Sequence, residues 1–290
     1  AVVPSNARVD GADAGSNIQV IPSRVGNHCQ ISDKVVRVSG RAQTVDTIGR
    51  ANELAYQLLN RGKELRRDVE AICLLNQTSV ADNGVATAGR TGGVPCWMTT
   101  NTSRWAAGAN GGFSGGIVTR PTVGTKRAFS ETILRDLIES AFNAGGSPSD
   151  ILVTPKMKRR ISEYLFSSSA RIGTIVTNQD TNSPGTAVGA VDIFVSDFGP
   201  LKLTPNRFML TYDLQDNGGG AYGGAGVSDV LIMDFQYWAM SFLRGYRTDP
   251  VARTGDADNR QMLVDYAVMC KNQGASAIAA DIDQTVAMTA

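Results

Sequence analysis

Residues 47–77 read TIGRANELAYQLLNRGKELRRDVEAICLLNQ and form the strongest helical pattern in the chain. Apolar residues recur in it every three or four positions with charged residues between them, which predicts an amphipathic helix. At 1.5 Å per residue, such a helix would be roughly 45 Å long, well above the average for a globular domain. Gly62 lies near its middle, and we expect a bend there, because glycine costs about 1 kcal/mol relative to alanine in a helix.

The segment before this helix predicts a β-hairpin. Two short β-prone runs in residues 27–40 flank residues 32–34 (SDK), which we interpret as the turn. The second run, 35–39 (VVRVS), alternates apolar and polar residues, so one of its faces is apolar. An isolated hairpin is marginal in water, so this one must lie on its own domain or on a neighbouring molecule. Residues 1–22 form a polar arm with little periodicity.

Residues 78–127 change in character. They are rich in glycine and small polar residues, with only scattered large apolar ones such as Trp97, Trp105 and Phe113. A loop of this length is unusual inside a compact domain and is generally functional or an interaction segment. We therefore expect neighbouring molecules to order it in an assembly.

The remainder of the chain predicts a compact unit of helices and strands. Ser130 is a suitable N-cap for a helix that reaches Phe142, and residues 151–153 (ILV) form a short buried strand. Pro155 then opens a second helix that extends to Phe166. Further elements are expected as strands at 191–195, 201–203, 230–234 and 262–270, with a glycine-rich tip at 217–226.

The charge balance argues against specific DNA recognition. The chain has 28 Lys and Arg residues against 27 Asp and Glu, a formal net charge of +1. Dedicated nucleic-acid binders usually carry a large basic excess, because neutralisation of phosphates dominates their affinity. The apolar runs are too short to cross a bilayer, so no membrane partner is expected.

Histidine and cysteine usage restricts the chemistry further. His28 is the only histidine, which excludes a multi-histidine metal site and leaves one candidate base for any hydrolytic triad. The cysteines lie far apart, without a C-x-x-C pair, at Cys29, Cys73, Cys96 and Cys270. This spacing argues against zinc and against a disulfide framework, and it fits a reducing cytoplasm. We expect no metal and no cofactor.

Three motifs have a functional and a structural interpretation. Residues 112–116 (GFSGG) fit the nucleophile elbow around Ser114, but that elbow needs a following helix and a later histidine. Residues 218–223 fit the dinucleotide-binding pattern, yet a strand follows them, which favours a hairpin tip. The basic run at 156–160 is interpreted as a solvated helix face rather than a nucleic-acid contact.

The order of arm, hairpin, long helix and α/β unit resembles the major capsid proteins of tailed bacteriophages, which have the Hong Kong 97-type fold. The stretches that carry the resemblance are 30–32 (QIS), 38–40 (VSG), 52–58 (NELAYQL), 62–70 (GKELRRDVE), 195–202 (VSDFGPLK), 205–207 (PNR), 234–238 (DFQYW) and 254–257 (TGDA). The resemblance covers about residues 27 to 283, and the order and spacing of these stretches together make it specific.

This resemblance implies an α+β chain with the named parts of a Hong Kong 97-like major capsid fold. Their expected ranges are an N-arm at 1–22, an E-loop hairpin at 23–46, the spine helix with part of the peripheral domain at 47–127, an axial domain at 128–250, and C-terminal strands that return to the peripheral domain at 251–290.

The resemblance further implies a structural protein and not an enzyme, which self-assembles into hexamers and pentamers of an icosahedral head around double-stranded DNA. Its partners would be copies of itself, portal, scaffolding or decoration proteins, and the packaged genome, in a virion assembled in the host cytoplasm. The candidate intersubunit contacts are Ile31, Asp33, Lys34, Val36, Arg37 and Val38. Two alternatives stay open: an encapsulin-like compartment shell, and a serine hydrolase that uses Ser114.

Overall fold

The structure is a computed structural model that describes residues 7, 9–11, 13, 23–45, 49, 52–167, 191–209, 211, 226–253 and 255–289. Its longer helices and strands are β1 (Gln30–Ser39), α2 (Glu53–Cys73), α4 (Glu131–Asn143), β5 (Asp150–Val153), α5 (Pro155–Ser167), β6 (Ile193–Ser196), β7 (Gly199–Pro205), β8 (Val227–Met233), β9 (Trp238–Val251), β10 (Ala257–Cys270) and β11 (Ala277–Asp283). The short ones are α1 (Gly40–Thr44), α3 (Val94–Trp97), β2 (Thr102–Ser103), β3 (Gly112–Ser114) and β4 (Ile117–Thr119), with 3-10 turns η2 (Phe235–Tyr237) and η3 (Gln273–Ala275).

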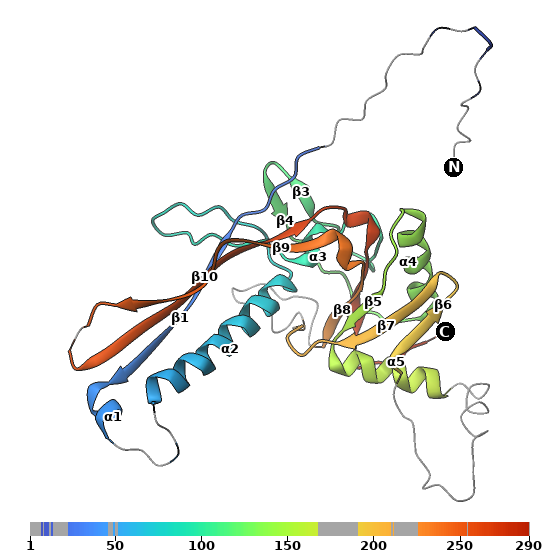
Figure 1. Cartoon of the computed structure of the whole chain (residues 1–290). Coiled ribbons are helices and arrows are strands. Elements are labelled where there is room, and N and C mark those ends of the chain that lie inside the picture. The colour runs from blue at the N-terminus through green and yellow to red at the C-terminus, as the bar shows by residue number, and fades with distance from the viewer. Residues whose placement is uncertain are drawn as a thin grey trace, which may run out of the picture.

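Two main sheets organise the described part of the chain. A three-stranded antiparallel sheet has the order β1-β10-β9, and a mixed six-stranded sheet has the order β2-β11-β8-β5-β7-β6. The six-stranded sheet lies in the compact part of the molecule, and the three-stranded sheet projects from it as a long ribbon along α2 (Figure 1). No helix in the described residues is both long and apolar enough to span a membrane.

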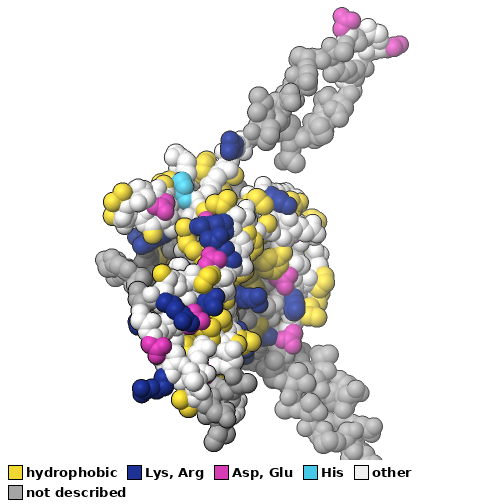
Figure 2. All heavy atoms as spheres, turned by 60° about the vertical axis from the view of Figure 1, so that its left-hand side comes forward, with side chains coloured by type: hydrophobic (Ala, Val, Ile, Leu, Met, Phe, Trp, Pro, Cys, Tyr) yellow, Lys and Arg dark blue, Asp and Glu magenta, His cyan; other side chains and the backbone are white. Residues whose placement is uncertain are grey.

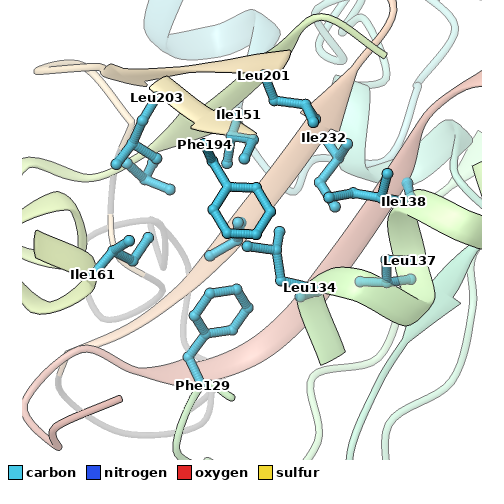
Figure 3. Packing of buried hydrophobic residues seen from close by; sticks show 14 of the residues in the cluster. Phe129, Leu134, Leu137, Ile138, Ile151, Ile161, Phe194, Leu201, Leu203 and Ile232 are labelled. Atoms are coloured by element: carbon cyan, nitrogen blue, oxygen red, sulfur yellow. The ribbon is translucent and has the colours of Figure 1, made fainter. Parts of the chain in front are cut away.

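The six-stranded sheet is covered on both faces, which explains why its central strands β8 and β11 are buried at every position. Val230 and Ile232 of β8 point to one side, into a core that α4 and α5 cover (Figure 3). Leu231 and Met233 point to the other side, where they pack against the segment around Trp97. The predicted helices of this unit are confirmed, including their start signals, because Ser130 caps α4 and Pro155 opens α5.

The long helix α2 is shorter than predicted but unbroken. The helix begins after Asn52, whose side-chain oxygen accepts a hydrogen bond from the Ala55 amide. Its 21 residues give a length of roughly 31 Å. The helix continues through Gly62, where a bend was expected. A Cβ atom at Gly62 would lie 3.1 Å from the Met262 methyl group, so the glycine sits where the helix closely approaches β10.

The hairpin predicted around residues 32–34 is wrong. Those residues lie within β1, a single strand that pairs with β10 from Gln30↔Tyr266 to Ser39↔Ala257. Asp33 and Lys34 can lie within a strand, because each side chain has a partner on the face of the sheet to which it points. Lys34 Nζ lies 2.7 Å from an Asp68 carboxylate oxygen, and Asp33 accepts a hydrogen bond from Gln261.

Part of the glycine-rich segment 78–127 packs on the chain's own core, contrary to our expectation, while Trp105 and Phe113 are exposed. Trp97 and Val118 belong to the core on one side of the six-stranded sheet. The buried carboxylate of Asp281 accepts hydrogen bonds from the backbone amides of Trp105 and Gly124, at 3.1 and 2.8 Å. Glycines permit this close packing: a Cβ atom at Gly93 would fall within 2 Å of a backbone carbonyl oxygen.

Strand pairing shows which sheet each of the later strands joins. β9 lies within the range expected for the axial domain, 128–250, but it pairs with β10 in the three-stranded sheet. β11 lies within the C-terminal range, 251–290, but it pairs with β8 in the six-stranded sheet. The chain therefore enters the ribbon after β8 and returns to the compact part after β10. The glycine-rich tip at 217–226, apart from Gly226, and most of the arm at 1–22 lie outside the described residues.

Candidate assembly surface

The three-stranded sheet has one face covered by α2, and on its other face the described chain covers only the part beside the start of β1, where the loop 81–90 packs. Leu65 and Val69 of α2 pack on Val264 and Tyr266 of β10 and form a small separate core. Side chains alternate between the faces of a strand, so every second residue of β1 points away from α2. We call this exposed side of β1, β10 and β9 the outer face.

The six residues predicted as intersubunit contacts are divided between the two faces. Ile31, Asp33 and Arg37 lie on the outer face, where Ile31 is 50% exposed. Val36 and Val38 point inward and are buried within this chain. Their role is to hold β1 on α2, together with the ion pair between Lys34 and Asp68.

Val35 also belongs to the outer face, although the sequence analysis did not select it. It is 54% exposed, whereas its neighbour Val36 is only 4% exposed. The signal was present in the alternation of residues 35–39, but the wrong turn assignment hid which face was buried. The outer face of β1 is therefore an apolar surface interrupted by charge: Ile31 and Val35 are apolar, and between them lies Asp33, which is hydrogen-bonded to Gln261.

Strand β9 adds an exposed apolar edge that the sequence analysis missed entirely. Phe242, Leu243 and Tyr246 are all exposed, and Leu243 is 71% exposed. Phe242 and Tyr246 lie on the α2 side of the sheet, because Phe242 pairs with Tyr266 and Arg66 of α2 lies over the Tyr246 ring. β9 pairs with β10 on one side, and no strand pairs with its other side in the part of the chain that the structure describes. Its two register irregularities with β10 disturb the alternating pattern by which a strand is recognised. The segment before the Gly255 turn is enriched in aromatic residues, and this enrichment is the sequence signal that could have identified β9 as a strand.

Exposed sheet edges with apolar side chains are sites at which other chains associate. Figure 2, turned so that the ribbon side of Figure 1 comes forward, shows hydrophobic side chains interspersed with Lys, Arg, Asp and Glu. Such a mixture is typical of a surface that must remain soluble before assembly and complementary to a partner afterwards.

The other candidate sites have structural roles in the described chain. Ser114 ends β3 and is followed by Gly115 and Gly116 in a hairpin turn to β4, so the predicted elbow lacks its helix. His28 lies elsewhere, beside Asp82 and Cys29. Among the described residues, no group of three His, Cys, Asp or Glu side chains is arranged to hold a metal ion. All four cysteines are free thiols.

Three of the four basic residues in the run 156–160 form ion pairs within the chain. Lys158 pairs with Asp192 at 2.5 Å, and the hydrogen bond from Lys158 lowers the pKa of that carboxyl. Arg159 and Arg160 both lie near Glu163, at 3.1 and 2.9 Å. These pairs support the interpretation of the run as a helix face.

Two solved structures share the fold. A chain of the holo-SrpI encapsulin complex from Synechococcus elongatus PCC 7942 has a TM-score of 0.51 and 9% identity, covering 89% of this chain and 76% of that one. A chain of Mycobacterium phage Bobi has a TM-score of 0.50 and 8% identity, covering 89% and 73%. At these identities the likeness concerns the fold alone, which is the expected Hong Kong 97 type.

Sequence comparisons give the family. A curated major capsid protein of Escherichia phage Phieco32 is 30% identical over 181 residues, which are 52% of this chain. The match spans about half the length of that curated relative, 51%. The family described as SU10 major capsid protein matches residues 1–283. The chain, with its Hong Kong 97-type fold, therefore belongs to the SU10 major capsid protein family.

Proposed function

We propose that this chain self-assembles into the hexamers and pentamers of an icosahedral phage head that encloses double-stranded DNA. The observation that carries the proposal is the uncovered ribbon of β1, β10 and β9 in a chain of the capsid protein family. The role is structural and not catalytic. The head would also contact a portal and scaffolding or decoration proteins, and it would form in the host cytoplasm.

The ribbon is poorly stabilised within one molecule. Among the described residues, its separate core cluster has four buried members, contributed by α2 and β10, and Val36 and Val38 of β1 add two more buried side chains. A sheet with one face on a single helix and a long free edge gains further stability when a second molecule covers the remaining apolar side chains. At about 25 cal/mol per Å² of apolar surface removed from water, each contact contributes a few kcal/mol before the costs of association. Many such contacts around each subunit would stabilise a shell.

The packaged genome would be held by confinement rather than by specific recognition. A net charge of +1 supplies little of the phosphate neutralisation on which nucleic-acid affinity depends. In the densest basic run, Lys158, Arg159 and Arg160 already pair with Asp192 and Glu163. Binding of isolated duplex DNA by the unassembled subunit is therefore expected to be weak and independent of sequence.

The test is to express the chain and image the purified product by negative-stain microscopy. Closed shells are expected from the wild type. Ile31→Asp places a charge on the outer face and is expected to prevent shell formation while leaving the subunit folded. Val286→Asp, a matched change at an exposed valine outside the ribbon, is the control and should assemble normally.

Two results would contradict the proposal: a wild type that stays monomeric under all assembly conditions, or Ile31→Asp shells that form as readily as those of the control. The cargo distinguishes the two kinds of shell. Nuclease-resistant DNA inside particles from infected cells indicates a phage head, whereas a packaged protein indicates an encapsulin-like compartment.

A further inference from the structure

A hollow of about 330 Å³ lies beside the outer face of the ribbon. One wall is the loop 81–90, and the other is formed by the start of β1 and by β10. The residues that line the hollow are His28, Cys29, Ile31, Asp82, Ala88, Gly89 and Asp265. Its volume is near the lower end of the range of roughly 300–1,000 Å³ for small-ligand pockets, so it admits a side chain rather than a folded element.

The loop that forms the first wall is fixed in place. Val80 and Arg90 exchange two backbone hydrogen bonds at its base, at 3.0 and 2.9 Å. At its tip, the side-chain oxygen of Asn83 accepts hydrogen bonds from three successive backbone amides. Gly89 packs so closely on the strand that a Cβ atom there would lie 2.8 Å from the carbonyl oxygen of Cys29. The hollow is therefore a built feature of the fold.

Asp265 contributes an incompletely satisfied carboxylate to this hollow. The residue is only 4% exposed, and its Oδ2 atom accepts hydrogen bonds from Arg244 at 3.2 and 3.3 Å. Its Oδ1 atom is buried and has no hydrogen-bond donor among the described residues. Buried carboxylate oxygens are nearly always hydrogen-bonded, because an unpaired one loses its hydration without compensation.

The second carboxylate of the hollow is that of Asp82. One of its oxygens accepts a hydrogen bond from the Gly84 amide at 2.6 Å. Asp82 and Asp265 thus both line a space whose lining includes no Lys or Arg, and of the two only Asp265 has an arginine partner among the described residues, Arg244. The complementary group is a cation with several N–H donors.

We propose that the hollow receives the guanidinium or ammonium group of a Lys or Arg side chain from a second copy of this chain, which pairs with the carboxylates of Asp82 and Asp265. The proposal rests on the proposed shell function. A second copy is the occupant because Ile31 belongs both to the hollow and to the outer face, so the site continues the surface that a neighbouring subunit would cover. Charge-assisted hydrogen bonds are directional, and such a contact would fix the orientation of the neighbour.

Cys29 provides a reporter inside the hollow, because it is the exposed thiol of this chain. Burial raises the pKa of the Cys73, Cys96 and Cys270 thiols to about 12, so they stay protonated and unreactive near pH 8. The experiment measures the alkylation rate of Cys29 by iodoacetamide in unassembled subunits and in assembled shells, by peptide mass spectrometry. We expect Cys29 to react at least tenfold more slowly in shells.

Substitutions then separate a cation contact from simple coverage. Asp82→Asn removes charge from the hollow but keeps an oxygen that can accept the Gly84 hydrogen bond. Asp265→Asn removes the charge at the proposed acceptor, with the fold checked by urea unfolding. Asp136→Asn, at an exposed carboxylate on α4, is the matched control. Both hollow variants should raise the critical concentration for assembly at least threefold and restore part of the reactivity of Cys29, whereas the control should change neither.

The outcomes are distinguishable. Wild-type shells in which Cys29 reacts as fast as in free subunits would overturn the inference and leave the shell function intact. So would hollow variants that assemble and protect Cys29 like the wild type, which would mean that water or simple coverage satisfies Asp265. Failure of the wild type to form shells would overturn the proposed function itself.

Discussion

Two adjacent valines of β1 give opposite expectations for stability and assembly. Val36 is 4% exposed and Val35 is 54% exposed, yet they share the same strand and nearly the same backbone. Val36→Ala removes two buried carbons, which at about 0.8 kcal/mol each, with a small cavity, costs about 2 kcal/mol of subunit stability. Val35→Ala should cost less than about 1 kcal/mol, because about half of that side chain is already in water.

Assembly should show the reverse order. If a neighbouring subunit covers the exposed 54% of Val35, its truncation loses about 0.9 kcal/mol for each contact, or about a fourfold weaker association. The critical concentration for shell formation should rise by about that factor. Val36→Ala subunits that remain folded should assemble close to the wild-type concentration, because Val36 contacts only its own chain.

The assays are urea unfolding of the unassembled subunit and light scattering of shell formation over a concentration series. Val35→Thr serves as a control, because it keeps the β-branched shape and strand propensity while replacing a methyl group by a hydroxyl. It should assemble less readily than the wild type. The reasoning is refuted if Val35→Ala leaves the critical concentration unchanged, or if it destabilises the subunit as much as Val36→Ala does.

Three further substitutions test the packing. Gly62→Ala should stabilise the subunit by up to about 1 kcal/mol in urea unfolding, because helix propensity improves and only the flexible Met262 methyl group must move; a loss of stability would show that the glycine is required. Gly93→Ala should cost more than about 2 kcal/mol by the same measurement, since its Cβ atom would overlap the Leu75 carbonyl oxygen; a change below 0.5 kcal/mol, about the scatter of a neutral substitution, would contradict that contact. Asp281→Ala should cost about 3 kcal/mol and raise amide hydrogen exchange in residues 102–125, because two buried N–H groups lose their acceptor; unchanged exchange would argue against this role.

Much of the compact part was predictable from the sequence, because its signals act over a few residues. Ser130 caps α4 through an amide three residues away, and Pro155 begins α5 because it needs no hydrogen-bond donor there. The run 151–153 is apolar on both sides, as a strand buried on both faces must be. The family resemblance likewise rested on local stretches of sequence, and the comparisons confirmed it.

The candidate surface was predictable only in part. Alternation along residues 35–39 correctly indicated two faces, but it did not show which partner would cover one of them. The inner face of β1 is the one that packs on α2. The strand that pairs with β1 and so orients it is β10, which lies more than two hundred residues later in the chain. The sequence reading therefore placed Val36 and Val38 at a subunit contact, whereas the fold buries them within one molecule.

By itself, the sequence indicated the three long helices α2, α4 and α5, the strands β5, β6, β7, β8 and β10, the family, and the exclusion of a multi-histidine metal site, because caps, periodicity and composition are local properties. Only the tertiary structure decided that residues 32–34 continue a strand, that Gly62 marks a close approach, and that part of the segment 78–127 packs on the chain's own core. Each of these depends on a group far along the chain, such as Asp68, Met262 or Asp281. A contact between distant residues forms only when folding brings those parts of the chain together, so a local sequence pattern cannot predict it.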